Sequence, residues 1–281
     1  MKLYISVDIE GLAGIVHFSQ EKEEKQLFRK AMHNQLEWII EGIHQSEKND
    51  EIEEITIADS HGTGMNLDYD FLSDLDDRIS LISGYPRPNY MMPLLDESYD
   101  AVFFVGYHGA VGSMHANMDH TYALSVIHRL RINNKAMSET QINAAYASEF
   151  NIPVALIVGD NALKEEVNKV MPWVEYVETK QSISRFSAKY YPKKVIKENT
   201  IHAVNKVLSS DLKALPLLTF DKPYRVEIEF NFGAQFDLAQ TIPNIEIIDG
   251  RTIAFTSHNY KELFEMIMMV IYTVRKAHPF A

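Results

Sequence analysis

The sequence predicts an α/β protein in which a mostly parallel sheet is flanked by helices and is followed by a smaller C-terminal α+β part. Two near-continuous apolar runs, residues 101–106 and 153–158, are typical of strands that are buried on both faces. Strand-like and helix-periodic segments alternate through the first half of the chain, as they do in parallel sheets. After Tyr190 the pattern changes to an amphipathic helix and short alternating strands.

The first segments alternate between strand and helix. Residues 3–7, 54–59 and 79–82 are short and rich in β-formers, and we predict a strand for each. Residues 21–48 are long, charged and periodic, which predicts one helix. Its apolar stripe consists of Leu27, Ala31, Leu36, Ile39, Ile40 and Ile43.

The segment between the two buried strands has a different character. Residues 121–132 are rich in β-formers but more polar, and the dipeptide Asn133-Asn134 that follows predicts a hairpin turn. Ser138 is a good N-cap for a helix that runs to about Phe150, because Gln141 stands at the position of a capping-box partner.

The last part of the chain predicts two helices and a small set of strands. The helices are residues 192–209 and 260–276, and the β segments are residues 224–230 and a hairpin over 245–256. We therefore expect two domains, one over residues 1–190 that contains the candidate metal and catalytic site, and a smaller one over residues 191–281.

Composition excludes several classes of protein. The chain has 281 residues, a formal net charge of -12 and no basic stripe, so it is not expected to bind nucleic acid. No apolar run approaches the ~20 residues of a membrane span, and the first residues do not resemble a signal peptide. The cytoplasm is the expected location. Because cysteine is absent, any metal must be held by oxygen and imidazole nitrogen.

Polar side chains gather where three predicted strands end. Asp8 and Glu10 follow the first strand, His61 follows the second, and His108 follows the apolar strand over residues 101–106. Ligands bind at the carboxyl ends of the strands in parallel sheets, so these side chains should meet at one edge. Carboxylate and imidazole together suit zinc and other divalent metals. The sequence therefore predicts a metal site at this edge, although each motif alone would be weak.

The same residues resemble an enzyme family, the zinc-dependent D-aminopeptidases. The match covers about residues 1–190, with the motifs in order and at similar spacing, and is looser beyond. The matching segments are residues 6–11, 59–61, 82–84 and 106–108, Glu139 before Asn143-Ala144, and residues 180–185. The resemblance implies a metallo-aminopeptidase that hydrolyses the amino-terminal peptide bond of short peptides containing D-amino acids. The attacking nucleophile would be a zinc-activated water molecule.

The resemblance also implies roles for single residues. Two zinc ions per subunit would share Asp8 as a bridge, although another divalent metal is possible. The full ligand set would be Asp8, Glu10, His61, His108 and Glu139. The family's catalytic histidine follows a Met-x-His pattern, which His120 fits, and His115 is its competitor. The relatives form closed rings, so a homo-oligomeric ring, possibly a decamer, is expected.

Some features stay open at this stage. Ser138 and Asn161 stand where the family usually has Gly and Asp, which leaves substrate choice undecided. Lys180 and Arg185 would lie near a substrate carboxylate, in a subunit contact or in a structural salt bridge. The alternatives are a phosphatase-like enzyme or another amide hydrolase on the same metal site, a nucleotide-binding module, and a non-catalytic oligomeric relative. The nucleotide module lacks its glycine spacing.

Overall fold

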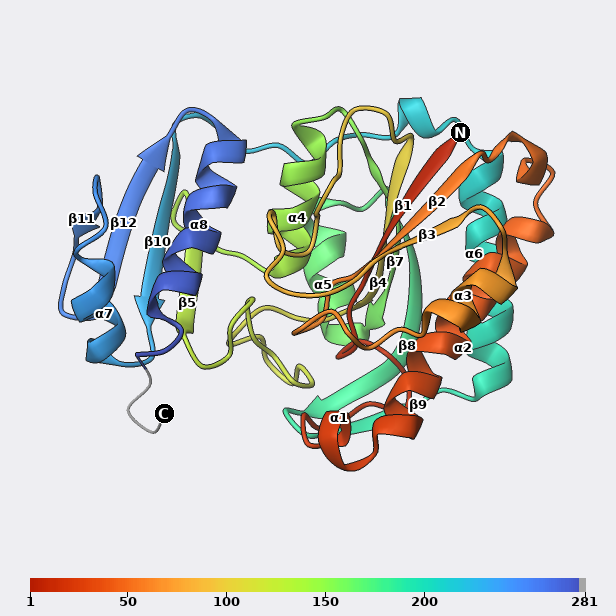
Figure 1. The fold of residues 1–281 in the computed structure, drawn as a ribbon, viewed down its shortest axis with the longest axis horizontal. Helices are drawn as coiled ribbons and strands as arrows, with labels where there is room; N and C mark the ends of the chain where they lie inside the picture. The colour runs from red at the N-terminus through yellow and green to blue at the C-terminus, as the bar shows by residue number, and fades with distance from the viewer. Residues whose placement is uncertain (278–281) are drawn as a thin grey trace.

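The computed structural model of the chain describes residues 1–277 and contains two β-sheets with helices between and around them (Figure 1). The larger sheet has seven strands and the smaller one has five. This arrangement confirms the predicted α/β class, with a mostly parallel sheet and a smaller α+β part. Within residues 1–277, no helix has the length and apolar character that a membrane crossing requires.

The seven-stranded sheet is parallel except at the edge where its last two strands pair. In spatial order its strands are β3 (Ile79–Ile82), β2 (Glu54–Asp59), β1 (Lys2–Val7), β4 (Ala101–Tyr107), β7 (Val154–Asp160), β8 (Glu175–Ser184) and β9 (Ser187–Tyr190). Because β1 pairs with both β2 and β4, the carboxyl ends of these three strands are neighbours.

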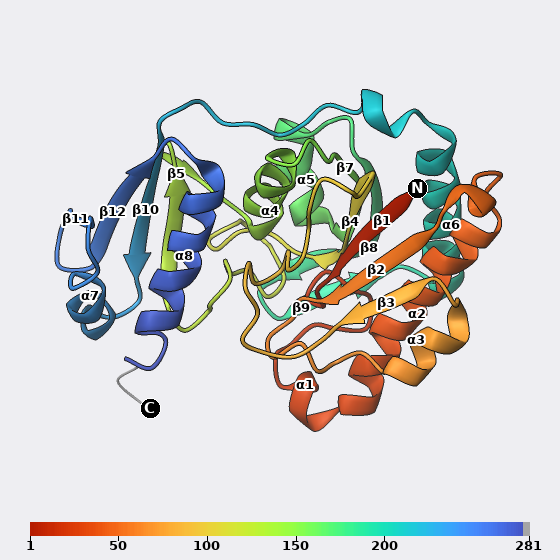
Figure 2. The ribbon, with the colours of Figure 1, turned by 45° about the horizontal axis from the view of Figure 1, so that its top comes forward.

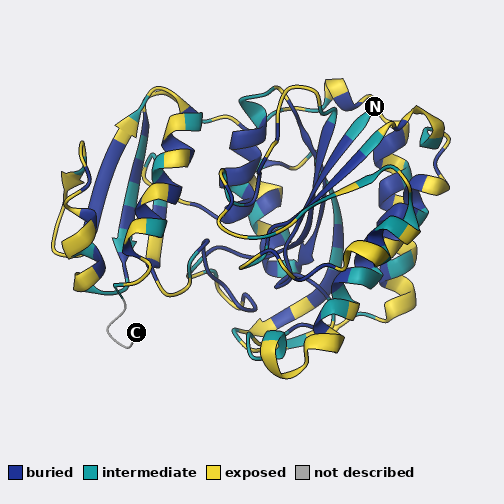
Figure 3. Cartoon of the chain, in the orientation of Figure 1, coloured by how far each residue is buried: buried dark blue, intermediate teal, exposed yellow. Residues whose placement is uncertain are grey.

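Helices cover both faces of this sheet (Figures 1 and 2). Alternate side chains of β1, such as Leu3 and Ile5, pack into one apolar core, and Tyr4 packs into the other. The first core contains residues of α2 (Lys25–His44), α3 (Tyr69–Leu75) and α6 (Lys193–Ser209), and the second contains residues of α4 (Glu139–Ser148) and α5 (Asn161–Val170). β4 and β7 are buried along their whole length, as their apolar runs predict (Figure 3).

The five-stranded sheet is antiparallel and lies beside the first one (Figure 1). Its strands, in spatial order, are β11 (Glu246–Ile247), β12 (Thr252–Ser257), β10 (Tyr224–Phe230), β5 (Ile127–Ile132) and β6 (Lys135–Ala136). Two helices, α7 (Gly233–Ala239) and α8 (Tyr260–Val274), pack on it. α8 also contacts α4, where Phe264 stacks on Tyr146 with 4.3 Å between ring centroids.

The two sheets do not divide the chain at residue 190. β5 and β6 come from before this residue yet belong to the five-stranded sheet, since β5 pairs with β10. α6 comes after it yet packs against α2 and the seven-stranded sheet. The division into residues 1–190 and 191–281 remains a prediction about domains, and the chain crosses between the sheets more than once.

The predicted helix over residues 21–48 is wrong in two respects. A short helix, α1 (Gln20–Glu23), is separated from α2 by Glu24, whose backbone leaves the helical region with φ -124° and ψ 39°. Leu27, assigned to the apolar stripe, is 61% exposed because it lies in the first turn of α2, away from the core. Leu36, Ile39 and Ile43 are buried as predicted.

Local turn chemistry is confirmed more closely than helix length. Asn133 and Asn134 both have positive φ, 49° and 67°, as the turn between β5 and β6 requires. Ser138 and Gln141 form the predicted capping box at the start of α4. The β8–β9 hairpin and α3 were not predicted, and two short 3₁₀ helices, Asn49–Glu51 and Leu212–Ala214, complete the fold.

Candidate metal centre

Loops at the carboxyl ends of three neighbouring strands bring the predicted ligands together. Asp8 and Glu10 follow β1, His61 follows β2, and His108 follows β4. Their side chains are almost fully buried, with His61 the most accessible at 12% of its side-chain surface. The strand-end reasoning from the sequence therefore placed these four side chains in one site.

Two further residues enter this site from elsewhere in the chain. Glu139 is the first residue of α4, and its Oε1 accepts a hydrogen bond of 2.5 Å from the backbone N–H of Tyr122. His120 lies in the loop between β4 and β5 and is 8% exposed. His115, its competitor in the same loop, is exposed and belongs to none of the possible ligand groups among residues 1–277. Of these two histidines, the structure brings His120 and not His115 into the group of candidate ligands.

The polar atoms of the site lie at separations that suit a shared cation. His61 Nδ1 is 2.9 Å from Asp8 Oδ1 and 3.5 Å from Glu10 Oε2. His108 Nε2 is 3.6 Å from Asp8 Oδ2 and 3.7 Å from Glu139 Oε1. These distances are too long for good hydrogen bonds in most pairs, and they leave room for an ion between the atoms.

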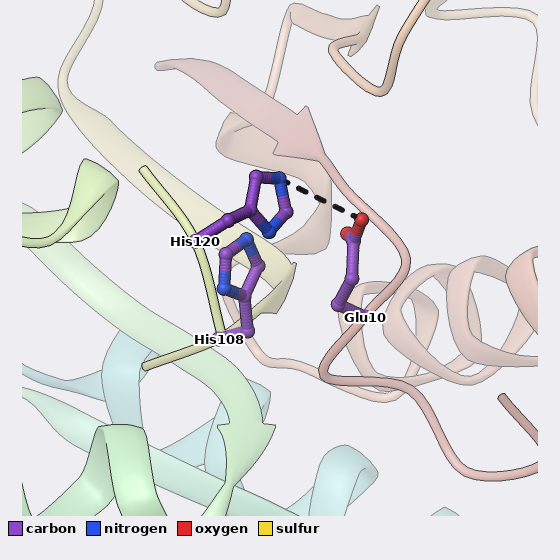
Figure 4. A group of neighbouring side chains, drawn as sticks. All are labelled: Glu10, His108 and His120. Carbon is purple, nitrogen blue, oxygen red and sulfur yellow. Dashed lines mark ion pairs between the residues drawn. The ribbon is translucent and has the colours of Figure 1, made fainter. Parts of the chain in front are cut away.

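Three groups of side chains could each hold a metal ion. Two of them are Asp8, Glu10 and His61, and Asp8, His108 and Glu139. These two groups share only Asp8, and together they contain the five ligands that the sequence resemblance implies. The third group is Glu10, His108 and His120, whose side chains face one another in Figure 4. His120 Nε2 is 3.9 Å from Glu10 Oε1, and its ring stacks on His108.

Unpartnered atoms at the centre of the site match a cation. Both carboxylate oxygens of Glu10 and Nε2 of His108 are buried and have no hydrogen-bond partner among the described residues. Burying a charge or a polar group without a partner is costly, so such atoms are typical of metal ligands. The other ring nitrogen of His108 contacts the Gly109 carbonyl at 3.0 Å, and that of His120 contacts the Met118 carbonyl at 2.9 Å. These contacts orient Nε2 of both rings into the site.

Burial and neighbouring charges shift the pKa values of three candidate ligands, His108, Glu139 and Glu10, and the direction of the shift differs among them. Burial, together with the neighbouring His120 ring, lowers the pKa of His108 to about 3, so this imidazole is neutral and able to bind a metal. Burial raises the pKa of Glu139 well above its usual range, and the charges of Asp8 and Glu10 add to this effect. Burial opposes ionisation of Glu10 as well, but the imidazoles of His61 and His120 outweigh it and lower the pKa to about 2.

Three glycines near the site lie so close to neighbouring backbone that none of them could carry a side chain. We call Gly11, Gly106 and Gly159 the glycine seam. A Cβ at Gly11 would lie 1.9 Å from the Tyr107 carbonyl oxygen, and one at Gly106 would lie 2.1 Å from the Asp8 carbonyl oxygen. Gly106 also has a φ of 76°. The glycine seam therefore lets the Asp8–Glu10 loop lie against the loop of His108.

Two basic residues of the matching motif prove to have structural partners. Lys180 is fully buried, and its ammonium donates to the carbonyls of Glu10 at 2.5 Å and Ile15 at 2.6 Å, and to Asn117 Oδ1 at 2.6 Å. It therefore ties the metal-binding loop to the loop of His120. Arg185 forms an ion pair with Asp119, the residue before His120. Arg185 thus forms a salt bridge, which was one of the alternatives for these two residues, whereas Lys180 forms hydrogen bonds and no salt bridge among residues 1–277.

The sequence did not indicate every side chain around the site. Glu21 Oε2 lies 3.7 Å from His61 Nε2, and the Phe18 ring meets the His120 ring edge-on at 5.7 Å. Both belong to the segment around α1, whose break from α2 was not predicted. Asp160, which also ends a strand, does not join the site: its side chain caps α5 and accepts a hydrogen bond from Ser182.

Comparisons with known proteins agree with this site. A family model described as D-aminopeptidase, peptidase family M55, matches residues 1–269. The chain belongs to the D-aminopeptidase family. The resemblance predicted from the sequence motifs is thereby confirmed, and with it the enzyme class, a metal-dependent hydrolase.

The sequence comparison and the structure comparison each find a D-aminopeptidase of Bacillus subtilis that aligns over nearly the whole chain. The sequence is 30% identical over 278 residues to a D-aminopeptidase of Bacillus subtilis (strain 168), with 96% of each chain covered. A solved structure with a TM-score of 0.87 covers 98% of both chains at 25% identity. It is the Zn-dependent D-aminopeptidase DppA from Bacillus subtilis, described as a self-compartmentalizing protease. The similarity to DppA therefore covers both sheets of the present chain.

Proposed function

We propose that this member of the D-aminopeptidase family hydrolyses the amino-terminal peptide bond of short peptides that contain D-amino acids. The single observation that supports this most is the pair of ligand groups that share Asp8. They fit two zinc ions per subunit, one held by Asp8, Glu10 and His61 and the other by Asp8, His108 and Glu139. Zinc supplies a Lewis acid that lowers the pKa of water and polarises the scissile carbonyl.

The residues of the chain itself would bind and orient the peptide and move a proton. The carboxylates of Asp8, Glu10 and Glu139 give the site a negative charge, which suits the ammonium group of a free amino terminus. His120 Nδ1 faces the Met118 carbonyl at 2.9 Å, which directs Nε2 toward the substrate side. We assign His120 Nε2 the proton that passes to the leaving amine. General acid catalysis of this kind contributes roughly 10²–10⁴-fold.

The variant His120→Ala tests this assignment. We expect it to retain zinc, measured by elemental analysis, and to lose roughly 10²–10⁴-fold in kcat on a D-aminoacyl peptide. His115→Ala is the matched control, since it removes an exposed histidine from the same loop, and it should keep normal turnover. Normal turnover in His120→Ala would refute the role, and loss of zinc would instead make His120 a ligand.

The alternative on the same metals, a phosphatase-like activity, is separated from this proposal by substrate. Zinc- and magnesium-loaded enzyme is screened on D- and L-aminoacyl amides and on generic phosphate esters. Cleavage of D-aminoacyl amides alone supports the proposal, and cleavage of phosphate esters alone contradicts it. If the protein as purified contains no zinc and the metal-loaded protein cleaves none of these substrates, the result would support the non-catalytic alternative.

We also propose that the chain assembles into a closed homo-oligomer in the cytoplasm. The support is the relative DppA, which is described as self-compartmentalizing, a property that requires several copies around an enclosed space. Sedimentation velocity of the purified protein measures the assembly directly. A monomer at micromolar concentration would contradict this part of the proposal.

A further inference from the structure

A cavity of about 520 Å³ joins the metal centre to α8. One side of it is formed by the candidate metal ligands and nearby loops, and the other side by residues of α8 and the residue that follows it. Figure 1 shows α8 on the side of the five-stranded sheet that faces the seven-stranded sheet. The cavity therefore extends well beyond the reacting centre and can bind a ligand along its length.

The charges on the wall of this cavity are distributed unevenly. Its four carboxylates are Asp8, Glu10, Glu21 and Glu139. Arg275 is the one lysine or arginine among the described residues of the wall. Arg275 forms no ion pair with any residue in 1–277, although Nη1 donates to the Tyr85 hydroxyl at 3.2 Å. A guanidinium without a carboxylate partner can receive one from a ligand in bidentate fashion.

A row of tyrosines connects the two charged regions. It begins at Tyr122, whose backbone N–H binds Glu139, and continues through Tyr90 with 5.8 Å between ring centroids. Tyr90 lies 6.3 Å from Tyr272, and Tyr272 lies 5.7 Å from Tyr85. The guanidinium of Arg275 lies 5.5 Å from the Tyr85 ring. The row thus fixes a path from the metal centre to Arg275.

The wall along this path is apolar and aromatic. Its members include Tyr90, Leu124, Met268, Ile271 and Tyr272. Such a wall binds apolar side chains, whereas the two ends bind opposite charges. A short peptide with a free amino terminus, apolar side chains and a free carboxyl terminus has this same sequence of groups.

We propose that Arg275 binds the carboxyl terminus of the peptide substrate and thereby selects short peptides with a free carboxylate over longer or amidated ones. This inference rests on the proposed aminopeptidase function and extends it to the far end of the substrate. Arg275 determines specificity and takes no part in bond cleavage. Because the side chain is exposed, the contribution of its ion pair is modest and is screened by salt.

Uncleavable peptide analogues test the inference in the intact, zinc-loaded protein. The probes are di-, tri- and tetrapeptides that begin with D-leucine and continue with D-alanine, in which CH₂ replaces the nitrogen of the first peptide bond. Each is made with a free carboxylate and as the carboxamide, and Kd is measured by calorimetry. We expect at least one length at which the carboxylate form binds roughly fivefold more tightly than the amide. In Arg275→Gln the ratio of the two Kd values should fall to about one.

Lys276→Gln is the matched control, because it removes the same charge from the next position, which does not line the cavity. It should leave the preference for the carboxylate unchanged. The inference is overturned if no length shows a preference, if the preference survives in Arg275→Gln, or if Lys276→Gln removes it equally. Hydrolysis of the parent peptides is measured separately. Preference without hydrolysis would contradict the proposed function alone, and hydrolysis without preference would contradict the role of Arg275 alone.

Discussion

Glu10 is the side chain that most clearly distinguishes this site from an ordinary polar core. Both of its oxygens are buried without a hydrogen-bond partner among residues 1–277, while its own backbone carbonyl accepts from Lys180. A charged carboxylate in this state requires a cation close by. The Glu10 carboxylate is therefore buried, fixed in position and free to bind a metal ion.

Lys180 donates a hydrogen bond to the backbone carbonyl of Glu10, and replacing it should lower the stability of the protein. Lys180→Met deletes three buried hydrogen bonds, to Glu10, Ile15 and Asn117, and leaves their acceptors unsatisfied. We expect a loss of about 3–5 kcal/mol in the free energy of unfolding, measured by urea denaturation. Lys189→Met, which changes an exposed lysine of β9, is the control and should cost less than about 0.5 kcal/mol. Equal effects of the two variants would refute the role of Lys180.

At the scale of one residue, sequence patterns predicted some members of the site and not others. Asp8, His61 and His108 follow strands, so the parallel-sheet rule alone indicated them. Glu139 starts a helix, where a carboxylate is ordinary, and only the family resemblance marked it as a ligand. Glu21 and Arg275 could not be predicted, because their place depends on how α1 and α8 pack against the sheet, which no local pattern specifies.

Among the elements, α4 has the most direct effect on the site, because its first residue is Glu139. The N-cap Ser138 accepts from the Gln141 N–H, and the Gln141 side chain accepts from the Ser138 N–H. The first turn of α4 is therefore fixed, and the carboxylate with it. Ser138 thus gives α4 a well-defined start.

Removing this cap should weaken the protein and its metal site together. We expect Ser138→Ala to lower the free energy of unfolding by about 1 kcal/mol and to reduce zinc affinity, because Glu139 gains freedom in an uncapped turn. Urea denaturation and a competitive zinc titration measure the two effects. Ser209→Ala, at the exposed end of α6, is the control and should change neither. Unchanged zinc affinity in Ser138→Ala would separate the cap from the metal site.

Element boundaries followed local chemistry where that chemistry was strong. The Asn133-Asn134 turn and the capping box of α4 are set by two or three adjacent residues, and both were predicted. The break at Glu24 has no glycine or proline to mark it, so periodicity alone suggested one long helix. The β8–β9 hairpin was missed because its strands are polar toward their tip, near Arg185, and lie at a sheet edge.

At the scale of the whole molecule, the site lies between the two sheets, and the chain crosses from one sheet to the other more than once. The loop of His120 leads from β4 of one sheet into β5 of the other, and α8 closes the opposite side of the cavity. The sequence predicted a second, smaller α+β part but not that β5 and β6 belong to its sheet. β5 pairs with β10, which is roughly a hundred residues further along, and such pairing is decided by tertiary packing.

Zinc should stabilise the whole fold, since the five proposed ligands come from three strand ends and the start of a helix. At free zinc near 100 times Kd, each bound ion contributes about 2.7 kcal/mol, which corresponds to roughly 5 °C in Tm for a chain of this size and to about twice that for two ions. Differential scanning calorimetry with zinc, with a chelator and after zinc is restored measures the shift. Glu10→Gln, which removes a ligand charge, should respond far less. A chelator that leaves wild-type Tm unchanged would contradict the site.

The glycine seam has a consequence for how tolerant this protein is to mutation. At Gly11, Gly106 and Gly159 there is no reactive group, yet a single added methyl group would overlap a neighbouring carbonyl oxygen. In an exhaustive substitution experiment, these three positions should be as intolerant as the metal ligands themselves. Part of what defines this active site is thus empty space that the chain must keep empty, and a search for functional groups alone would overlook it.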